Sequence, residues 1–240
     1  MASRAEPVAE ARTPVGGPFR LAVTDFYFDS LRLVRANLVW SAGLILAVVV
    51  GIGWPFGGLV LLCALALPTA AVFRTAADIV RPDTVAGRHE LRWAFGRRLG
   101  RLLLVGLGFV IAVTVCAWNV VGGLASGGPY GWAFATLAAW GLVASWCLAV
   151  VLWPVLVDPE RPDRPLTDDL TLALQVIFTE PRRMVRLALV TGLIVIVSVV
   201  LTAAILTVSV AFVALLGCRT VYPMVDRLEA QSAMPVGPTG

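Results

Sequence analysis

The chain has 240 residues, of which 59% are hydrophobic and only 14% are charged. Soluble domains carry about 25% charged residues, whereas several stretches here run about 20 residues without charge, the length that a helix needs to span a bilayer. This composition excludes an ordinary soluble protein and predicts an all-α, polytopic membrane helix bundle, because backbone amides in lipid must be paired within helices. The net charge of +4 comes from arginines that flank apolar runs. They suit the anionic surface of a lipid bilayer, and no nucleic-acid partner is predicted.

The N-terminal segment mixes charged residues with prolines and lacks the apolar stretch of a cleavable signal. We predict a disordered cytoplasmic tail over residues 1–20, a single transmembrane helical domain over residues 21–230, and a second disordered tail over residues 231–240. Residues 21–36 have helical spacing that places Asp25, Asp29 and Arg32 on one side. This pattern predicts an amphipathic helix at the membrane interface that leads into the first span.

Four spans are expected in the next part of the chain. Two of them, at residues 38–53 and 56–76, are joined by the uncharged turn GWPFG. The basic amphipathic segment 90–101 then leads into two further spans, at residues 102–121 and 133–156, which are joined by a glycine-rich turn. Each pair of spans is therefore predicted to form a helical hairpin.

A third amphipathic helix is expected after the charged, proline-rich residues 158–165, which do not fit a membrane-embedded helix. Thr167 can cap this helix, and the acidic residues Asp168 and Asp169 suit its first turn. Its predicted apolar side includes Leu174 and Phe178. Pro181 is expected to end or kink it.

The last apolar block, residues 187–217, has two interpretations. As one helix it would be about 46 Å long against a hydrocarbon core of about 30 Å, and as two helices it gives only about 15 residues for each. Six transmembrane helices, arranged as three hairpins with cytoplasmic lead-in helices, would place every charged residue on one side. Five spans, the alternative, would leave Arg219, Asp226, Arg227 and Glu229 outside. The positive-inside rule favours six spans, with both termini cytoplasmic in the plasma (inner) membrane.

Few residues are candidates for chemistry inside the membrane. Arg74 and Asp78 lie four apart near the cytoplasmic end of the second span, where they form either a membrane-edge ion pair or a gate. Several uncharged polar residues serve either helix packing or a solute pathway, namely Asn119, Ser145, Ser198 and Thr202.

No arrangement of residues typical of a catalytic, phosphate-binding or metal site occurs in the sequence. We therefore expect no enzyme, no cofactor and no metal. Two amphipathic segments provide the candidate partner-docking residues, which are Arg92, Phe95, Arg97, Arg98, Leu174, Phe178, Arg182 and Arg183.

Several short motifs resemble the YesL-like family of bacterial integral membrane proteins. They are N-x-x-W (37–40), L-P-T-A-A-x-x-R (67–74), the aromatic and arginine-rich segment 93–101, and the helix with E-P-R-R over 171–184. The similarity covers about residues 25–228. Members of that family often accompany genes for ABC-type carbohydrate uptake, so the resemblance implies an accessory role in such a system. The chain lacks the E-A-A-x-x-x-G signature of an ABC permease subunit, and its basic residues are all arginine.

Two functions of different classes are therefore expected. The first is a non-enzymatic membrane protein that is an accessory or regulatory partner of carbohydrate ABC transporter subunits. The alternative is a small-solute permease or channel formed by the helix bundle. The sequence predicts no particular substrate or oligomeric state.

Overall fold

The computed structural model describes residues 17–81, 99–161, 164–200 and 208–233, and this part of the chain is helical without any strand. The helices are α1 (Pro18–Phe28), α2 (Ser30–Gly53), α3 (Pro55–Ala64), α4 (Ala66–Val80), α6 (Leu99–Ser126), α7 (Pro129–Val157), α8 (Leu166–Thr179), α9 (Pro181–Val200) and α11 (Val210–Ala233). Within the described residues, four helical stretches are long and apolar enough to cross a membrane: Ser30–Gly53, Pro55–Val80, Leu99–Ser126 and Pro129–Val157. The prediction of an all-α protein with several apolar spans is confirmed.

The first lead-in helix differs from its prediction, because it breaks at Asp29. α1 ends at Phe28, and residues 30–36 belong to the same helix as the first span. α1 packs on α11, where Phe19 and Phe26 both contact the ring of Phe212 edge to face. The break lets α1 follow α11 while α2 packs against α3 and α4.

The predicted turn GWPFG joins α2 and α3. Trp54 has an extended backbone, which the following proline favours, and Pro55 opens α3 at a position where its missing N–H costs nothing. The helix then breaks once more at Leu65. Pro68 accounts for this break, because its ring has no N–H for the carbonyl of Ala64 and would clash with it.

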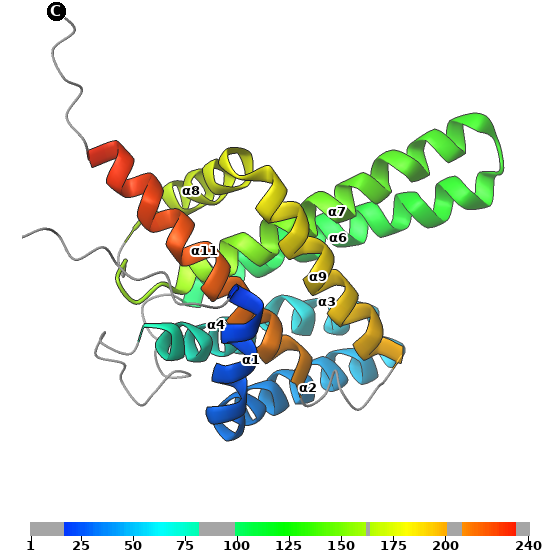
Figure 1. Cartoon of the computed structure of the whole chain (residues 1–240). Coiled ribbons are helices and arrows are strands. Elements are labelled where there is room, and N and C mark those ends of the chain that lie inside the picture. Colours follow the sequence, from blue (N-terminus) through cyan, green and yellow to red (C-terminus); the bar gives the residue numbers. More distant parts are fainter. Residues whose placement is uncertain (1–16, 82–98, 162–163, 201–207, 234–240) are drawn as a thin grey trace, which may run out of the picture.

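α6 and α7 form a long hairpin that projects from the rest of the molecule (Figure 1). Its turn is much shorter than the predicted 122–131, because Gly122 and Gly123 are still helical. The reversal takes place at Gly127, whose φ of 65° lies in the left-handed region that glycine adopts without strain.

The described parts of the block 187–217 belong to two helices. α9 ends at Val200 and α11 begins at Val210. The hydroxyl of Ser209 donates a hydrogen bond to that of Ser198, eleven residues earlier. Two residues so spaced would lie about 16 Å apart along one helix axis, so α9 and α11 are not parts of one straight helix. The number of spans stays a prediction.

The core is concentrated at one end of the bundle. α4 is almost wholly buried and contacts α2, α7 and α11, and the C-terminal part of α7 from Val150 to Val157 is buried as well. The outer half of the α6–α7 hairpin is largely exposed, as at Trp118 and Trp140. Large exposed apolar faces of this kind suit contact with lipid.

Two of the short motifs in the sequence contact each other in this core. The indole N–H of Trp40, in the N-x-x-W motif, donates a hydrogen bond of 2.9 Å to the hydroxyl of Thr69, in the L-P-T-A-A-x-x-R motif. Asn37 is fully buried, and its side-chain oxygen accepts a hydrogen bond from the N–H of Ala211 in the first turn of α11. Both motifs therefore join helices to one another.

Candidate functional site

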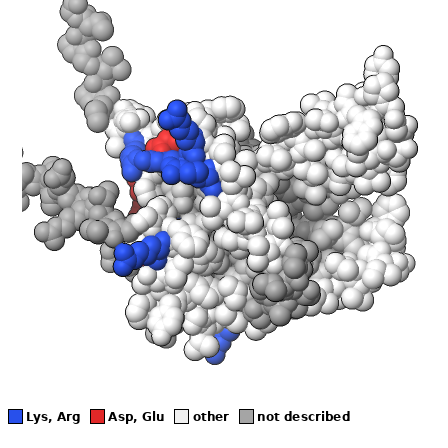
Figure 2. Space-filling view, turned by 45° about the vertical axis from the view of Figure 1, so that its right-hand side comes forward, with Lys and Arg blue, Asp and Glu red and all other residues white. Residues whose placement is uncertain are grey.

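The charged side chains gather at the end of the molecule where the core lies. Figure 2 shows arginines and acidic residues on the left of one face, while the right-hand side of that face carries neither. The four apolar stretches that qualify as spans each contain a window of 18 residues with at most two charges. Among the described residues, polar interactions are therefore possible mainly at the charged helix ends and on α8.

A cluster of ion pairs joins the charged ends of α4, α7 and α11. We name it the charge cluster and define it as Arg81, Asp158, Arg161, Asp226 and Glu229. The guanidinium of Arg81 binds both carboxylate oxygens of Asp226, at 2.8 and 2.9 Å, and lies 3.3 Å from Asp158. Arg161 binds Asp226 at 2.8 Å and Glu229 at 2.7 Å, and it also pairs with Asp158.

The charge cluster is well shielded from solvent at its centre. The side chain of Asp158 is only 1% exposed, and those of Arg81 and Arg161 are 9% and 8% exposed. Hydrogen bonds from Arg161 hold the pKa of Glu229 below its usual value, and Arg164 acts in the same direction. Glu229 therefore stays ionised at neutral pH, and the cluster fixes three helix ends relative to one another.

Arg74 and Asp78 form the predicted pair, with the Arg74 Nε atom 3.3 Å from the Asp78 carboxylate. Both side chains face the bundle interior. Arg74 also donates a hydrogen bond of 2.9 Å to the carbonyl of Val157, and Arg32 pairs with Asp78 at 3.2 Å. These contacts connect α2, α4 and α7, so the pair is a joint between helices. A gating role for it stays a prediction.

The polar residues proposed for a pathway are not brought together. Asn119 donates to the carbonyl of Val115, and Ser145 donates to that of Gly141, each within its own helix. Ser198 bonds its own helix as well, in addition to its contact with Ser209. Thr202 lies outside the described residues. The three that are described lie on three different helices, α6, α7 and α9.

α8 leaves part of its predicted apolar side exposed. Leu172, Ala173 and Val176 are buried, whereas Leu174 is 44% and Phe178 78% exposed. The expected N-cap is also wrong: α8 begins two residues earlier, at Leu166, and the hydroxyl of Thr167 donates a hydrogen bond to the side chain of Asp168. The acidic first turn is as predicted.

The start of α9 is exposed as well. Arg182 and Arg183 are both exposed there, and Arg183 pairs with Glu180 at 2.6 Å. We name Leu174, Phe178 and Arg182 the α8 face. The other candidate docking residues, Arg92, Phe95, Arg97 and Arg98, lie outside the described residues.

α8 is held firmly against the bundle. Asp169 in its first turn pairs with Arg101 of α6, and Glu180 at its end lies 3.5 Å from Arg227 of α11. The buried side of the helix packs on the main core. The α8 face is therefore displayed by a fixed helix.

The charge cluster and the buried role of Asn37 were not predicted from the sequence. Asn37 is a lone asparagine at the start of an apolar run. This position is a signal in the sequence, because a buried amide needs hydrogen-bond partners. Asp226 and Glu229 are three residues apart and therefore share one helix face. This spacing predicts that they have a common partner, but it does not identify that partner. In the described ranges, no three His, Cys, Asp or Glu side chains are placed to hold a metal ion. The acidic residues face arginines instead.

Comparisons of the chain with protein-family models, with curated proteins and with solved structures find no match.

Proposed function

We propose that the protein is a non-enzymatic, multi-pass protein of the plasma membrane that acts as an accessory or regulatory partner of a membrane transport complex. Its α8 face would be the docking surface. The observation that carries this proposal is Phe178, a phenylalanine 78% exposed at the charged end of the molecule and outside the four qualifying spans. Aromatic and arginine side chains are the usual anchors of protein interfaces.

The rigidity of α8 supports the same proposal. A partner that binds a preformed helix face loses little conformational freedom, so more of the contact energy appears as affinity. Leu174 and Phe178 lie four residues apart on one face, which is the spacing of anchors that fit a groove on a partner. Arg182, exposed in the first turn of α9, adds a positive charge nearby in the sequence.

For the class of partner we propose the subunits of a carbohydrate ABC-type uptake system. This step rests on the resemblance of the short motifs to the YesL-like family. Residues 90–101, with Arg92, Phe95, Arg97 and Arg98, would add a second contact from the same side of the membrane.

For the topology we propose six spans in three hairpins, with the charged end and both termini in the cytoplasm. α9 and α11 would form the third hairpin. The apolar part of α9 from Leu187 is only about 21 Å long, so this hairpin would draw Arg186 and Arg219 close to the lipid headgroups. The positive-inside rule supports the orientation.

The proposal predicts that Phe178→Ala disrupts partner binding. Phe178 and Phe28 are almost equally exposed, at 78% and 77%, so Phe28→Ala is a matched control. Truncating an aromatic anchor costs about 2 kcal/mol or more, which lowers affinity about thirtyfold. After photocrosslinking in native membranes, the unsubstituted protein and Phe28→Ala should both recover ABC transporter subunits, and Phe178→Ala should not.

Two results of that experiment would contradict the proposal. One is equal recovery of transporter subunits from both variants, which would remove the α8 face from the interface. The other is crosslinking to lipid alone when a photoreactive residue replaces Phe178, which would make Phe178 a membrane anchor.

A further inference from the structure

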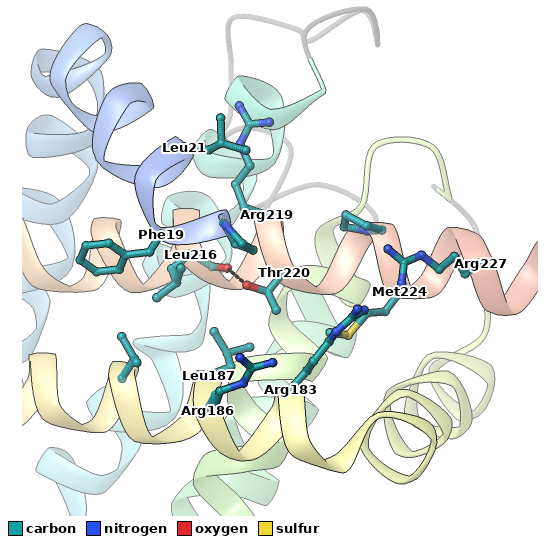
Figure 3. A pocket seen from close by; sticks show the side chains of 13 residues that line it. Phe19, Leu21, Arg183, Arg186, Leu187, Leu216, Arg219, Thr220, Met224 and Arg227 are labelled. Carbon is teal, nitrogen blue, oxygen red and sulfur yellow. Dashed lines mark hydrogen bonds between the residues drawn. The ribbon is translucent and has the colours of Figure 1, made fainter. Parts of the chain in front are cut away.

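A groove of about 560 Å³ lies between α1, α9 and α11. Its walls are mostly apolar and include Phe19, Leu187, Val190, Leu216 and Met224. Four arginines also line it, Arg183 and Arg186 from α9 and Arg219 and Arg227 from α11 (Figure 3). One groove thus combines an apolar wall with a concentration of positive charge.

The carboxylates around the groove do not balance these four guanidinium groups. Glu180 pairs with Arg183 at 2.6 Å and lies 3.5 Å from Arg227, and Asp25 pairs with Arg219 at 2.7 Å. Arg186 is exposed and forms no ion pair within the described ranges. Four positive charges therefore face two negative ones, so the groove suits an anionic ligand.

The groove lies where the charged end of the molecule meets its apolar part. Arg186 directly precedes the apolar segment of α9, and Arg219 directly follows that of α11. In a bilayer, arginines at such positions reach the level of the phosphate groups. Basic pockets between helices at this depth bind anionic headgroups.

An apolar track leads away from the groove along α9. Val190 lines the groove, and Leu193 and Val197 follow it at spacings of three and four, which keeps them on the same helix face. Leu193 is 61% and Val197 47% exposed. This track would accept an acyl chain whose headgroup lies among the arginines, whereas a small soluble anion would leave it uncovered.

We propose that this groove is a binding site for an anionic phospholipid, with the headgroup phosphate held by Arg183 and Arg186 and the acyl chain lying along α9. Arg219 and Arg227 add positive charge from the opposite side. Bound lipid would connect α9 to α1 and α11. The proposal depends on the bilayer location and is independent of any docking at the α8 face.

The test is retention of phosphatidylglycerol by the purified full-length protein, measured by native mass spectrometry against phosphatidylcholine of the same chain length. For Arg183→Gln/Arg186→Gln we expect the affinity for phosphatidylglycerol to fall about thirtyfold and that for phosphatidylcholine to stay unchanged. Arg20→Gln/Arg35→Gln removes the same charge from two exposed arginines that do not line this groove. This control should retain phosphatidylglycerol.

A second variant separates lost binding from lost folding. Glu180→Gln removes the carboxylate that competes for Arg183 and Arg227, so it should raise the affinity for phosphatidylglycerol. A protein that is merely destabilised would not bind the lipid more tightly.

Three outcomes would overturn the proposal. If Arg20→Gln/Arg35→Gln lowers the affinity for phosphatidylglycerol equally, the effect comes from overall charge and not from this groove. If inorganic phosphate competes with phosphatidylglycerol and binds with equal affinity, the groove is a site for small anions. Lipid binding that appears only after removal of residues 2–16, which include Glu6 and Glu10, would mean that this segment occupies the groove in the full chain.

Discussion

Gly106→Val is expected to lower the free energy of unfolding by about 3 kcal/mol, at the upper end of the cost of overpacking. A Cβ atom at Gly106 would lie 2.6 Å from the carbonyl oxygen of Cys63 and 2.7 Å from the Cβ of Ala66. Backbone and alanine atoms have no rotamer that removes such a clash. α6 would therefore have to move away from α3 and α4, and its packing on the core would loosen.

The matched control is Gly108→Val, two residues further along the same helix. A Cβ atom at Gly108 meets nothing within 4 Å, and valine has a slightly higher helix propensity than glycine. This variant should be neutral or slightly more stable. Unfolding in detergent, followed by the fluorescence of the eight tryptophans, measures both. Equal losses in the two variants would show that α6 does not approach α3 as closely as described.

Arg81→Gln is expected to destabilise the protein by about 3 kcal/mol, because removing one member of a buried ion-pair network leaves the others uncompensated. Arg81 pairs with Asp158 on α7 and Asp226 on α11, and it lies 4.4 Å above the ring of Tyr222. Asp226 is half exposed and can be rehydrated, but the side chain of Asp158 is 1% exposed. Most of the loss should arise at Asp158.

Arg35→Gln provides the comparison for Arg81→Gln. Arg35 is an exposed arginine on α2, and a surface substitution of this kind usually changes stability by less than about 0.5 kcal/mol. The same unfolding measurement applies. If Arg81→Gln costs no more than Arg35→Gln, the charge cluster does not stabilise the junction of α4, α7 and α11.

The sequence predicted the helical architecture because its signals are local. Long uncharged runs define the spans, and proline after an extended tryptophan defines the turn between α2 and α3. Predictions of smaller features were incomplete because those features depend on packing between helices. The break at Asp29 depends on how α1 packs on α11, and the buried part of the apolar side of α8 depends on how α8 packs on the core. Neither contact has a signature in the nearby sequence.

The candidate site was predicted only where partners lie close along the chain. Arg74 and Asp78, four apart on one helix, were identified as a pair, whereas their connections to Arg32 and Val157 are long-range and were not. The same holds for the charge cluster and the arginine-lined groove. The charge cluster and the groove are both formed by helix ends that are far apart in the sequence. The spacing of residues within a helix does not predict which helix ends contact each other.

The topology is tested most directly by reporter fusions after Gly240 and between Gly127 and Gly128. With six spans and a cytoplasmic charged end, a reporter after Gly240 should be active only on the cytoplasmic side and one at the α6–α7 turn only on the outer side. An external reporter after Gly240 would contradict this account, because it would place the charged end of α11 across the membrane from the cytoplasm. The α8 face would then have no cytoplasmic partner to bind.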